Sequence, residues 1–132
     1  MYLAGFSSST VNQFKSAIYV SSAYAKNGEL FAGSDIKLKE NITPISNQFI
    51  SELFGMDNIT YEFDWKGSGK HSAGMIAQWI KEYMPETVDY NKDLQLYSVN
   101  YNAALSKLVG ALFKKIKQQD IIINDILNKL NK

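Results

Sequence analysis

Residues 105–130 read LSKLVGALFKKIKQQDIIINDILNKL, and apolar side chains recur in this stretch at alternating intervals of four and three residues. The positions on this spacing are Leu105, Val109, Leu112, Ile116, Gln119, Ile123, Ile126 and Leu130. The repeat predicts one long helix whose apolar stripe occupies the a and d positions of a coiled coil. With Val109 at an a position, isoleucine stands at both a and d near the end of the helix, which favours assemblies of more than two chains.

The same repeat also fits an amphipathic helix that packs on its own domain, and periodicity alone does not separate the two structures. Gln119 lies in the middle of the stripe, where a buried polar side chain sets the register of a coiled coil. That position favours oligomerisation. The lysines of this helix are predicted to form its solvated flank rather than a nucleic-acid-binding stripe; they are Lys107, Lys114, Lys115 and Lys117.

The composition is that of one folded domain and excludes several kinds of site. The chain has 132 residues, of which 45% are hydrophobic, so it is long enough to bury a core. It has no cysteine and one histidine, which excludes disulfides, thiolate ligands and a histidine-rich metal site. A net charge of +1 gives no electrostatic reason to bind nucleic acid or an anionic membrane. We expect no metal, no cofactor, no nucleic acid and no membrane as partners.

Upstream of the helix, the pattern predicts short elements. Ser46 is a helix N-cap, Gly55 a helix end, and alternation of apolar and polar residues from Ile59 to Trp65 is typical of a half-buried strand. Together the chain predicts a helix from Ser46 to Phe54, a strand from Ile59 to Trp65, a returning strand over Ala73–Ile76 and a helix from Gln78 to Met84. The expected fold is α+β, with a small antiparallel sheet, short helices and a long C-terminal helix that forms a trimeric coiled coil.

Residues 1–33 differ from the rest of the chain, because serine clusters and small residues interrupt any periodicity. Asn27–Gly28 predicts a turn, and Glu29–Ala32 predicts a short strand that ends at Gly33.

Two candidate sites, a phosphate-binding loop and a hydrolytic triad, are rejected because the positions of their residues do not fit. The segment WKGSGKHS, residues 65–72, contains Gly69–Lys70 but has Asp64 where a phosphate-binding loop needs glycine, and His71 where the loop needs serine or threonine. A hairpin turn explains it better. Asp64, His71 and Ser72 contain the residue types of a hydrolytic triad, but neighbouring residues on a loop do not build that geometry.

The segment SDIKLKENI, residues 34–42, holds a serine and a lysine five residues apart. Serine and lysine act as nucleophile and base when the lysine is desolvated, because desolvation favours the neutral amine. An extended strand places Ser34 and Lys39 on opposite faces, and a helix sets them well apart around its axis. A productive pair therefore needs a turn, or a lysine from a neighbouring subunit.

The segment also resembles the start of the C-terminal intramolecular chaperone domain of phage tail spikes, tail fibres and neck appendages. Endosialidase tailspikes carry this domain, and the autoprocessing segment of myelin regulatory factor is a eukaryotic relative. The resemblance runs from Ser34 to Lys132 and includes further blocks in the same order: Tyr61–Trp65, Ala73–Gln78, Pro85–Val88, Val99–Tyr101 and the heptad helix. Lys37 replaces a common arginine, and Trp79 stands where an acidic residue is usual.

The resemblance implies a homotrimeric folding clamp that registers the fibre upstream and then releases itself by autoproteolysis. It implies Ser34 as nucleophile, Lys39 as base, Gly33–Ser34 as the scissile bond, and supporting roles for Asp35 and Asn41. Residues 1–33 are then the end of the mature fibre or appendage, and residues 34–132 the autoprocessing domain. The expected setting is the cytoplasm of the bacterial host during assembly, with the upstream part in the virion tail or neck. The alternative is a structural module that trimerises a virion adhesin and stays attached.

Overall fold

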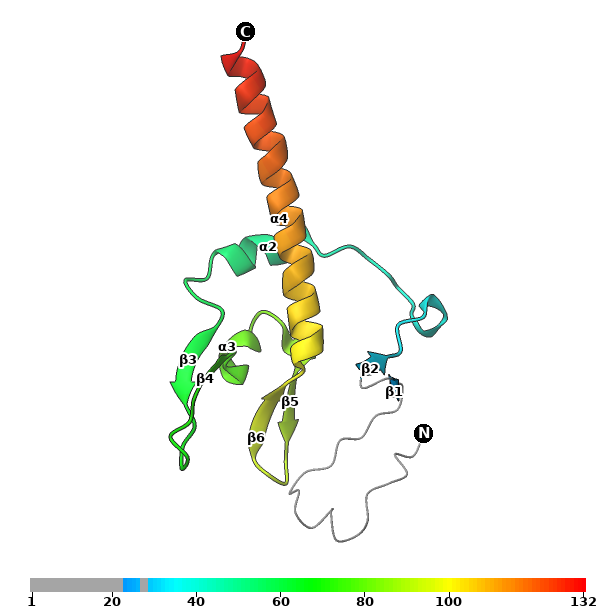
Figure 1. Cartoon of the computed structure of the whole chain (residues 1–132), viewed down its shortest axis with the longest axis vertical. Coiled ribbons are helices and arrows are strands. Elements are labelled where there is room, and N and C mark those ends of the chain that lie inside the picture. Colours follow the sequence, from blue (N-terminus) through cyan, green and yellow to red (C-terminus); the bar gives the residue numbers. More distant parts are fainter. Residues whose placement is uncertain (1–22, 27–28) are drawn as a thin grey trace. The chain divides into compact units, whose positions relative to one another are not determined.

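The computed structural model describes residues 23–26 and 29–132, and the side chains of residues 33–132 (Figure 1). The predicted Asn27–Gly28 turn lies outside the described residues. The chain divides into two compact units, Met1–Thr43 and Pro44–Lys132, and each is described by itself. This division concerns packing, whereas the boundary predicted between residues 33 and 34 concerns processing and stays a prediction.

The described part of the first unit is a strand pair followed by a single turn of helix. Strand β1 (Ala23–Lys26) pairs antiparallel with β2 (Glu29–Ala32), with Ala23 opposite Ala32 and Lys26 opposite Glu29. The predicted strand over Glu29–Ala32 is confirmed. After Gly33 comes the 3-10 helix η1 (Ile36–Leu38), which has no buried residue.

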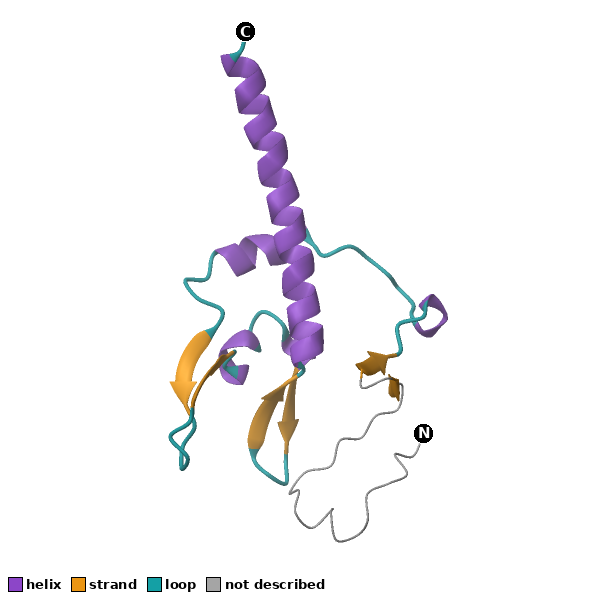
Figure 2. Ribbon diagram, viewed as in Figure 1, coloured by secondary structure: helices purple, strands orange, loops and turns teal. Residues whose placement is uncertain are grey.

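The second unit contains short elements followed by one long helix (Figure 2). In chain order they are α2 (Asn47–Phe54), β3 (Tyr61–Asp64), β4 (His71–Gly74), α3 (Ala77–Ile80), η2 (Pro85–Thr87), β5 (Val88–Asn91), β6 (Leu96–Val99) and α4 (Tyr101–Leu130). Ser46 caps α2 by accepting a hydrogen bond from Phe49 N at 3.0 Å, and Gly55 ends the helix, as predicted. The α+β class and the long C-terminal helix are confirmed.

The strands form separate hairpins rather than one sheet. Among the described residues, β1–β2, β3–β4 and β5–β6 are each a two-stranded antiparallel sheet. Strand β4 begins two residues before the predicted Ala73, because a tight turn closes directly after β3. In this turn Trp65 N donates to Lys70 O at 2.9 Å, and Gly67 and Gly69 adopt positive φ angles of 89° and 65°. The hairpin interpretation of this segment is confirmed.

Two further expectations need correction. Helix α3 ends at Ile80 rather than Met84, because the chain turns after it: Tyr83 N and Met84 N both donate to Ile80 O, at 3.0 Å and 2.8 Å. Met84 itself leaves the helical region, with φ −135° and ψ 60°, before Pro85. Trp65 was expected in the half-buried strand, but β3 ends at Asp64 and the Trp65 side chain is exposed, with its ring edge-on to Phe63.

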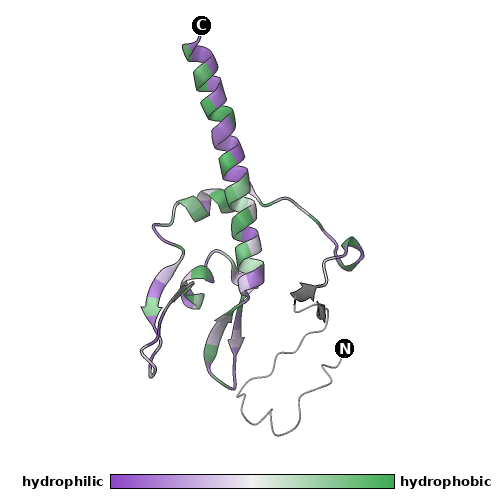
Figure 3. Ribbon diagram, viewed as in Figure 1, coloured by the Kyte–Doolittle hydropathy of each residue, from purple (hydrophilic) through white to green (hydrophobic). Residues whose placement is uncertain are grey.

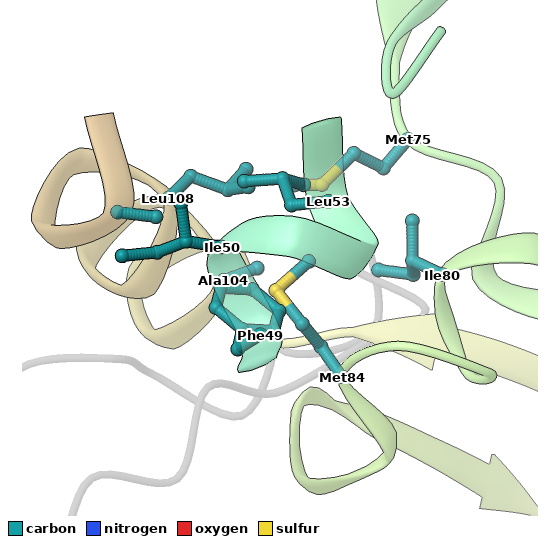
Figure 4. Packing of buried hydrophobic residues seen from close by; sticks show 9 residues of the cluster. Phe49, Ile50, Leu53, Met75, Ile80, Met84, Ala104 and Leu108 are labelled. Carbon is teal, nitrogen blue, oxygen red and sulfur yellow. The ribbon is translucent and has the colours of Figure 1, made fainter. Parts of the chain in front are cut away.

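A small apolar core joins α2, α3 and the first half of α4 (Figure 4). Its buried residues are Phe49, Ile50, Leu53, Met75, Ile80, Met84, Ala104, Leu108 and Ala111. Two methionines, Met75 and Met84, fill the space between α2 and α3, and two alanines let α2 lie close to α4.

Helix α4 uses one face for its own domain and leaves another uncovered. Ala104, Leu108 and Ala111 are buried against the core. All a and d positions of the predicted apolar stripe, from Leu105 to Leu130, are exposed; we call this stripe the seam. Val109 on the seam retains 64% of its accessible surface. At 3.6 residues per turn the seam lies roughly 100° around the helix axis from the buried face. Own-domain packing therefore does not account for the heptad pattern.

No helix among residues 23–26 and 29–132 is long and apolar enough to cross a membrane.

Candidate functional site

Ser34 and Lys39 are brought together by the turn of η1. The turn closes through Leu38 N, which donates to Asp35 O at 3.0 Å, and Lys39 N, which donates to Ile36 O at 3.1 Å. Asp35 is the N-cap residue, with an extended backbone, and Lys39 is the C-cap residue. The chain thus reverses between the two ends of the segment, and Lys39 Nζ donates a hydrogen bond to Ser34 Oγ at 2.8 Å.

The spacing left two geometries open for this contact. The sequence required either a turn or a neighbouring chain, and the structure forms the contact through a turn within one chain. No second chain is needed to bring the two atoms together. A separation of 2.8 Å lies within the range over which a side chain transfers a proton to or from a nucleophile.

The pair is open to water in a single chain. Ser34 and Lys39 are both exposed, and so are the apolar side chains of Ile36, Leu38 and Ile42 around them, at 72%, 69% and 65%. The segment that carries the dyad therefore leaves three apolar side chains in contact with water.

The two supporting residues of the motif have visible backbone roles. Asp35 Oδ1 accepts a hydrogen bond from Lys37 N at 2.8 Å. Asn41 adopts a left-handed φ of 52°, a conformation that asparagine tolerates better than most residues. Gly33 directly precedes Ser34, and both residues of the predicted scissile bond are exposed.

The rejected triad is also not formed. His71 Nδ1 lies 2.8 Å from Asp64 Oδ1, and His71 Nε2 lies 3.6 Å from Glu62 Oε1. The histidine is therefore bracketed by two carboxylates on the neighbouring strand. Ser72 is the next residue of β4, and successive side chains of a strand point to opposite faces. No group of three or more potential ligands in the described part of the chain is arranged to hold a metal ion.

The lysines of α4 have partners within the chain. Lys107 Nζ forms an ion pair with Glu86 and lies 4.2 Å from the centre of the Phe49 ring. Lys114 Nζ donates to Ile45 O at 2.6 Å. Lys115 and Lys117 lie over aromatic rings of the same chain, at 5.1 Å and 5.3 Å. Lys117 is exposed, as predicted for a solvated flank, but Lys107, Lys114 and Lys115 are only partly exposed because they contact the domain.

The Ser34–Lys39 turn also lies at the start of the region that matches a known protein family. Residues 34–89 match the family described as chaperone of endosialidase. The match confirms the resemblance from the SDIKLKENI segment to the Pro85–Val88 block, whereas Val99–Tyr101 and the heptad helix lie outside the matched region. The description assigns this family a chaperone role, and its name classes it with peptidases.

The chaperone-of-endosialidase match begins at Ser34 and ends within β5, so it spans the turn, α2, the β3–β4 hairpin and α3. Helix α4 follows the matched region. No curated protein matches the chain.

Proposed function

We propose that residues 34–132 are an intramolecular chaperone that trimerises the polypeptide upstream of it and then cuts itself free at Gly33–Ser34. The observation that carries this proposal is the hydrogen bond from Lys39 Nζ to Ser34 Oγ at the first residue of the matched region. The upstream fibre or appendage region of the same polypeptide is the substrate. The setting is the bacterial host cytoplasm during assembly of a phage tail or neck.

The cleavage chemistry needs only the dyad and water. Neutral Lys39 takes the proton of the Ser34 hydroxyl, and Ser34 Oγ attacks the carbonyl carbon of Gly33. The Gly33–Ser34 C–N bond then breaks, and the lysine returns its proton to the departing amine of Ser34. Gly33 is now held as an ester on Ser34 Oγ. Water hydrolyses this ester, which leaves a Gly33 carboxylate and a chain that begins at Ser34.

Trimerisation is supported by the uncovered face of α4. The residues that pack on the domain, Ala104, Leu108 and Ala111, lie outside the heptad stripe. Figure 3 shows hydrophobic and hydrophilic residues interleaved along the projecting end of α4, where no other element of the second unit covers it. A stripe of exposed isoleucine, leucine and valine along a helix is stable in water only when other apolar surface covers it.

In this proposal, assembly promotes cleavage because it removes water from Lys39. In a single chain Ser34 and Lys39 are exposed to water, and desolvation of a lysine favours its neutral form. We infer that neighbouring chains cover the apolar side chains of the turn and desolvate Lys39, so that cleavage follows assembly.

The test is direct. The full chain, expressed and separated by denaturing electrophoresis, should yield a fragment whose N-terminal residue is Ser34, as read by N-terminal sequencing. Ser34→Ala should remain intact while its oligomeric state, measured by sedimentation, is unchanged. A wild-type chain that trimerises but stays intact would support the alternative, a structural trimerisation module of a virion adhesin. A fragment from Ser34→Ala would refute the nucleophile assignment.

A further inference from the structure

Packing does not hold the turn that carries the dyad. Helix η1 is three residues long and has no buried residue. Its ends are held by two backbone hydrogen bonds, of 3.0 Å and 3.1 Å, and by the Asp35 carboxylate, which accepts from Lys37 N at 2.8 Å. A 3-10 turn has poorer hydrogen-bond geometry than an α-helix, so a side chain that satisfies one of its free N–H groups has a large share in keeping it closed.

Lys39 can contact Ser34 only while the turn is closed. Ser34 immediately precedes the N-cap residue, and Lys39 is the C-cap residue. If the turn opened into an extended chain, the five-residue step from Ser34 to Lys39 would span roughly 16 Å of backbone. The fraction of molecules with a closed turn therefore limits the fraction in which Lys39 Nζ reaches Ser34 Oγ.

We propose that Asp35 is a positioning residue for the self-cleavage: its carboxylate caps η1 and so holds Lys39 against Ser34. The inference rests on the proposed function. Asp35 acts through the backbone of the turn, because its oxygen binds Lys37 N, and none of the ion pairs formed by the described residues joins Asp35 to Lys39.

A capping role and a charge role make opposite predictions for two conservative variants. Asp35→Asn keeps a side-chain oxygen that caps as well as aspartate but removes the charge. Asp35→Glu keeps the charge, but glutamate is not among the residues that cap a helix N-terminus well. Asp35→Ala removes both properties. Glu40→Gln is the matched control, since Glu40 is an exposed carboxylate of the same segment and lies outside the cap.

The experiment follows the rate at which the Ser34 fragment appears in the full chain. Loss of an N-cap oxygen lowers the ratio of closed to open turns about fivefold, so Asp35→Ala and Asp35→Glu should be cleaved more slowly, by up to about fivefold. Asp35→Asn and Glu40→Gln should stay within about twofold of the wild-type rate. The pH profile of Asp35→Asn should keep the wild-type midpoint, because the cap does not depend on charge.

Two further measurements separate positioning from a general loss of structure. Thermal unfolding and sedimentation should be the same for all variants, since no core residue is changed. In the uncleaved Ser34→Ala background, Asp35→Ala should speed hydrogen exchange at the Lys37 amide, whereas Asp35→Asn should not.

The outcomes are distinguishable. Asp35→Asn as slow as Asp35→Ala, or Asp35→Ala cleaved at the wild-type rate, would overturn the positioning role and leave the proposed function intact. An intact wild-type chain would overturn the proposed function itself.

Discussion

Lys39 reaches Ser34 through a single nitrogen, 2.8 Å from the serine oxygen. Lys39→Arg places a guanidinium there, which keeps its positive charge at any pH that the protein tolerates. We expect Lys39→Arg to be as inactive in cleavage as Lys39→Ala, and the wild-type rate to rise with pH, because only a neutral amine accepts the serine proton. Denaturing electrophoresis over a pH series measures both effects. Near-normal cleavage by Lys39→Arg would remove the lysine from the mechanism.

Gly74 is a position at which an added Cβ atom should destabilise the fold. The Tyr101 hydroxyl accepts a hydrogen bond from Met75 N at 3.0 Å and fastens the end of β4 to the start of α4. A Cβ atom on Gly74 would overlap this hydroxyl oxygen. Gly74→Ala should therefore lower the free energy of unfolding by about 1–3 kcal/mol, measured by denaturant titration.

Tyr101→Phe provides the control for that prediction. It removes the oxygen that the new Cβ would meet, and the next nearest ring atom is at an ordinary distance of 3.4 Å. Gly74→Ala should then cost clearly less in the Tyr101→Phe background than in the wild type. Equal costs in both backgrounds would show that the hydroxyl contact is not what Gly74 protects.

Among the elements, η2 is tied to α4 by the ion pair between Glu86 and Lys107. Burial acts to raise the pKa of Glu86, but hydrogen bonds from Lys107 and from the backbone, together with the ammonium charge, hold that pKa below its ordinary value. A carboxyl with a lowered folded-state pKa stabilises the fold above its unfolded pKa, about 4.3, and loses this contribution as pH falls through the folded value. Because Glu86 is about half exposed, we expect less than about 1 kcal/mol.

Acid unfolding of wild type and Glu86→Gln measures this contribution. The difference in unfolding free energy between the two proteins should be constant from pH 7 to about 5 and should shrink below about pH 4. Glu82→Gln, in the turn after α3, is the matched control for the loss of one carboxylate, since none of the ion pairs of the described residues includes Glu82. A difference that does not change with pH would mean that the ion pair is not its source.

The elements also show what could be predicted from sequence. Helix α2 was predictable because its end signals are local: Ser46 accepts from Phe49 N, and Gly55 ends the helix. Helix α4 was predictable because its period extends over many turns. The β5–β6 hairpin was missed, since it is stabilised by the cross-strand pair of Tyr90 and Tyr97, with ring centres 4.8 Å apart. That pair exists only once the strands have met.

The candidate site was predictable in its residues but not in its geometry. Spacing alone left a turn and a neighbouring chain as alternatives for Ser34 and Lys39. The decisive cue was Asp35, an N-cap residue type directly before Ile36, which signals a helical turn. Asn91 was a similar cue to the missed hairpin, because its side chain accepts from Leu94 N at 2.9 Å inside the connecting turn.

For the whole molecule, the proposal links assembly to cleavage. Ile123 lies on the seam and Ile121 on the opposite side of α4, and in a single chain they are similarly exposed, at 52% and 69%. In a trimer, Ile123→Asp would put three carboxylates into one core layer, where charge repulsion and lost apolar burial both oppose association. We expect Ile123→Asp to sediment as a monomer and to stay uncleaved, and Ile121→Asp to trimerise and cleave normally.

Fusion of an unrelated trimeric coiled coil after Lys132 should restore cleavage to Ile123→Asp, because the fusion supplies association without touching the dyad. Sedimentation and electrophoresis of the same sample provide both readouts. Since the Ser34–Lys39 contact already exists within one chain, restoration would mean that trimerisation contributes desolvation rather than alignment. Efficient cleavage in a demonstrated monomer would refute the link.

The reach of α4 beyond its own domain has a thermodynamic consequence. Gln118 donates to Asn47 at 3.3 Å, and from Gln119 onward every residue is exposed, so roughly 18 Å of helix at 1.5 Å per residue projects beyond the packed part of the second unit. A segment this short barely holds a helix in water by itself. If the chains trimerise as proposed, the helicity of this segment and the association of the chains stabilise each other, and the helical content of the protein should fall on dilution.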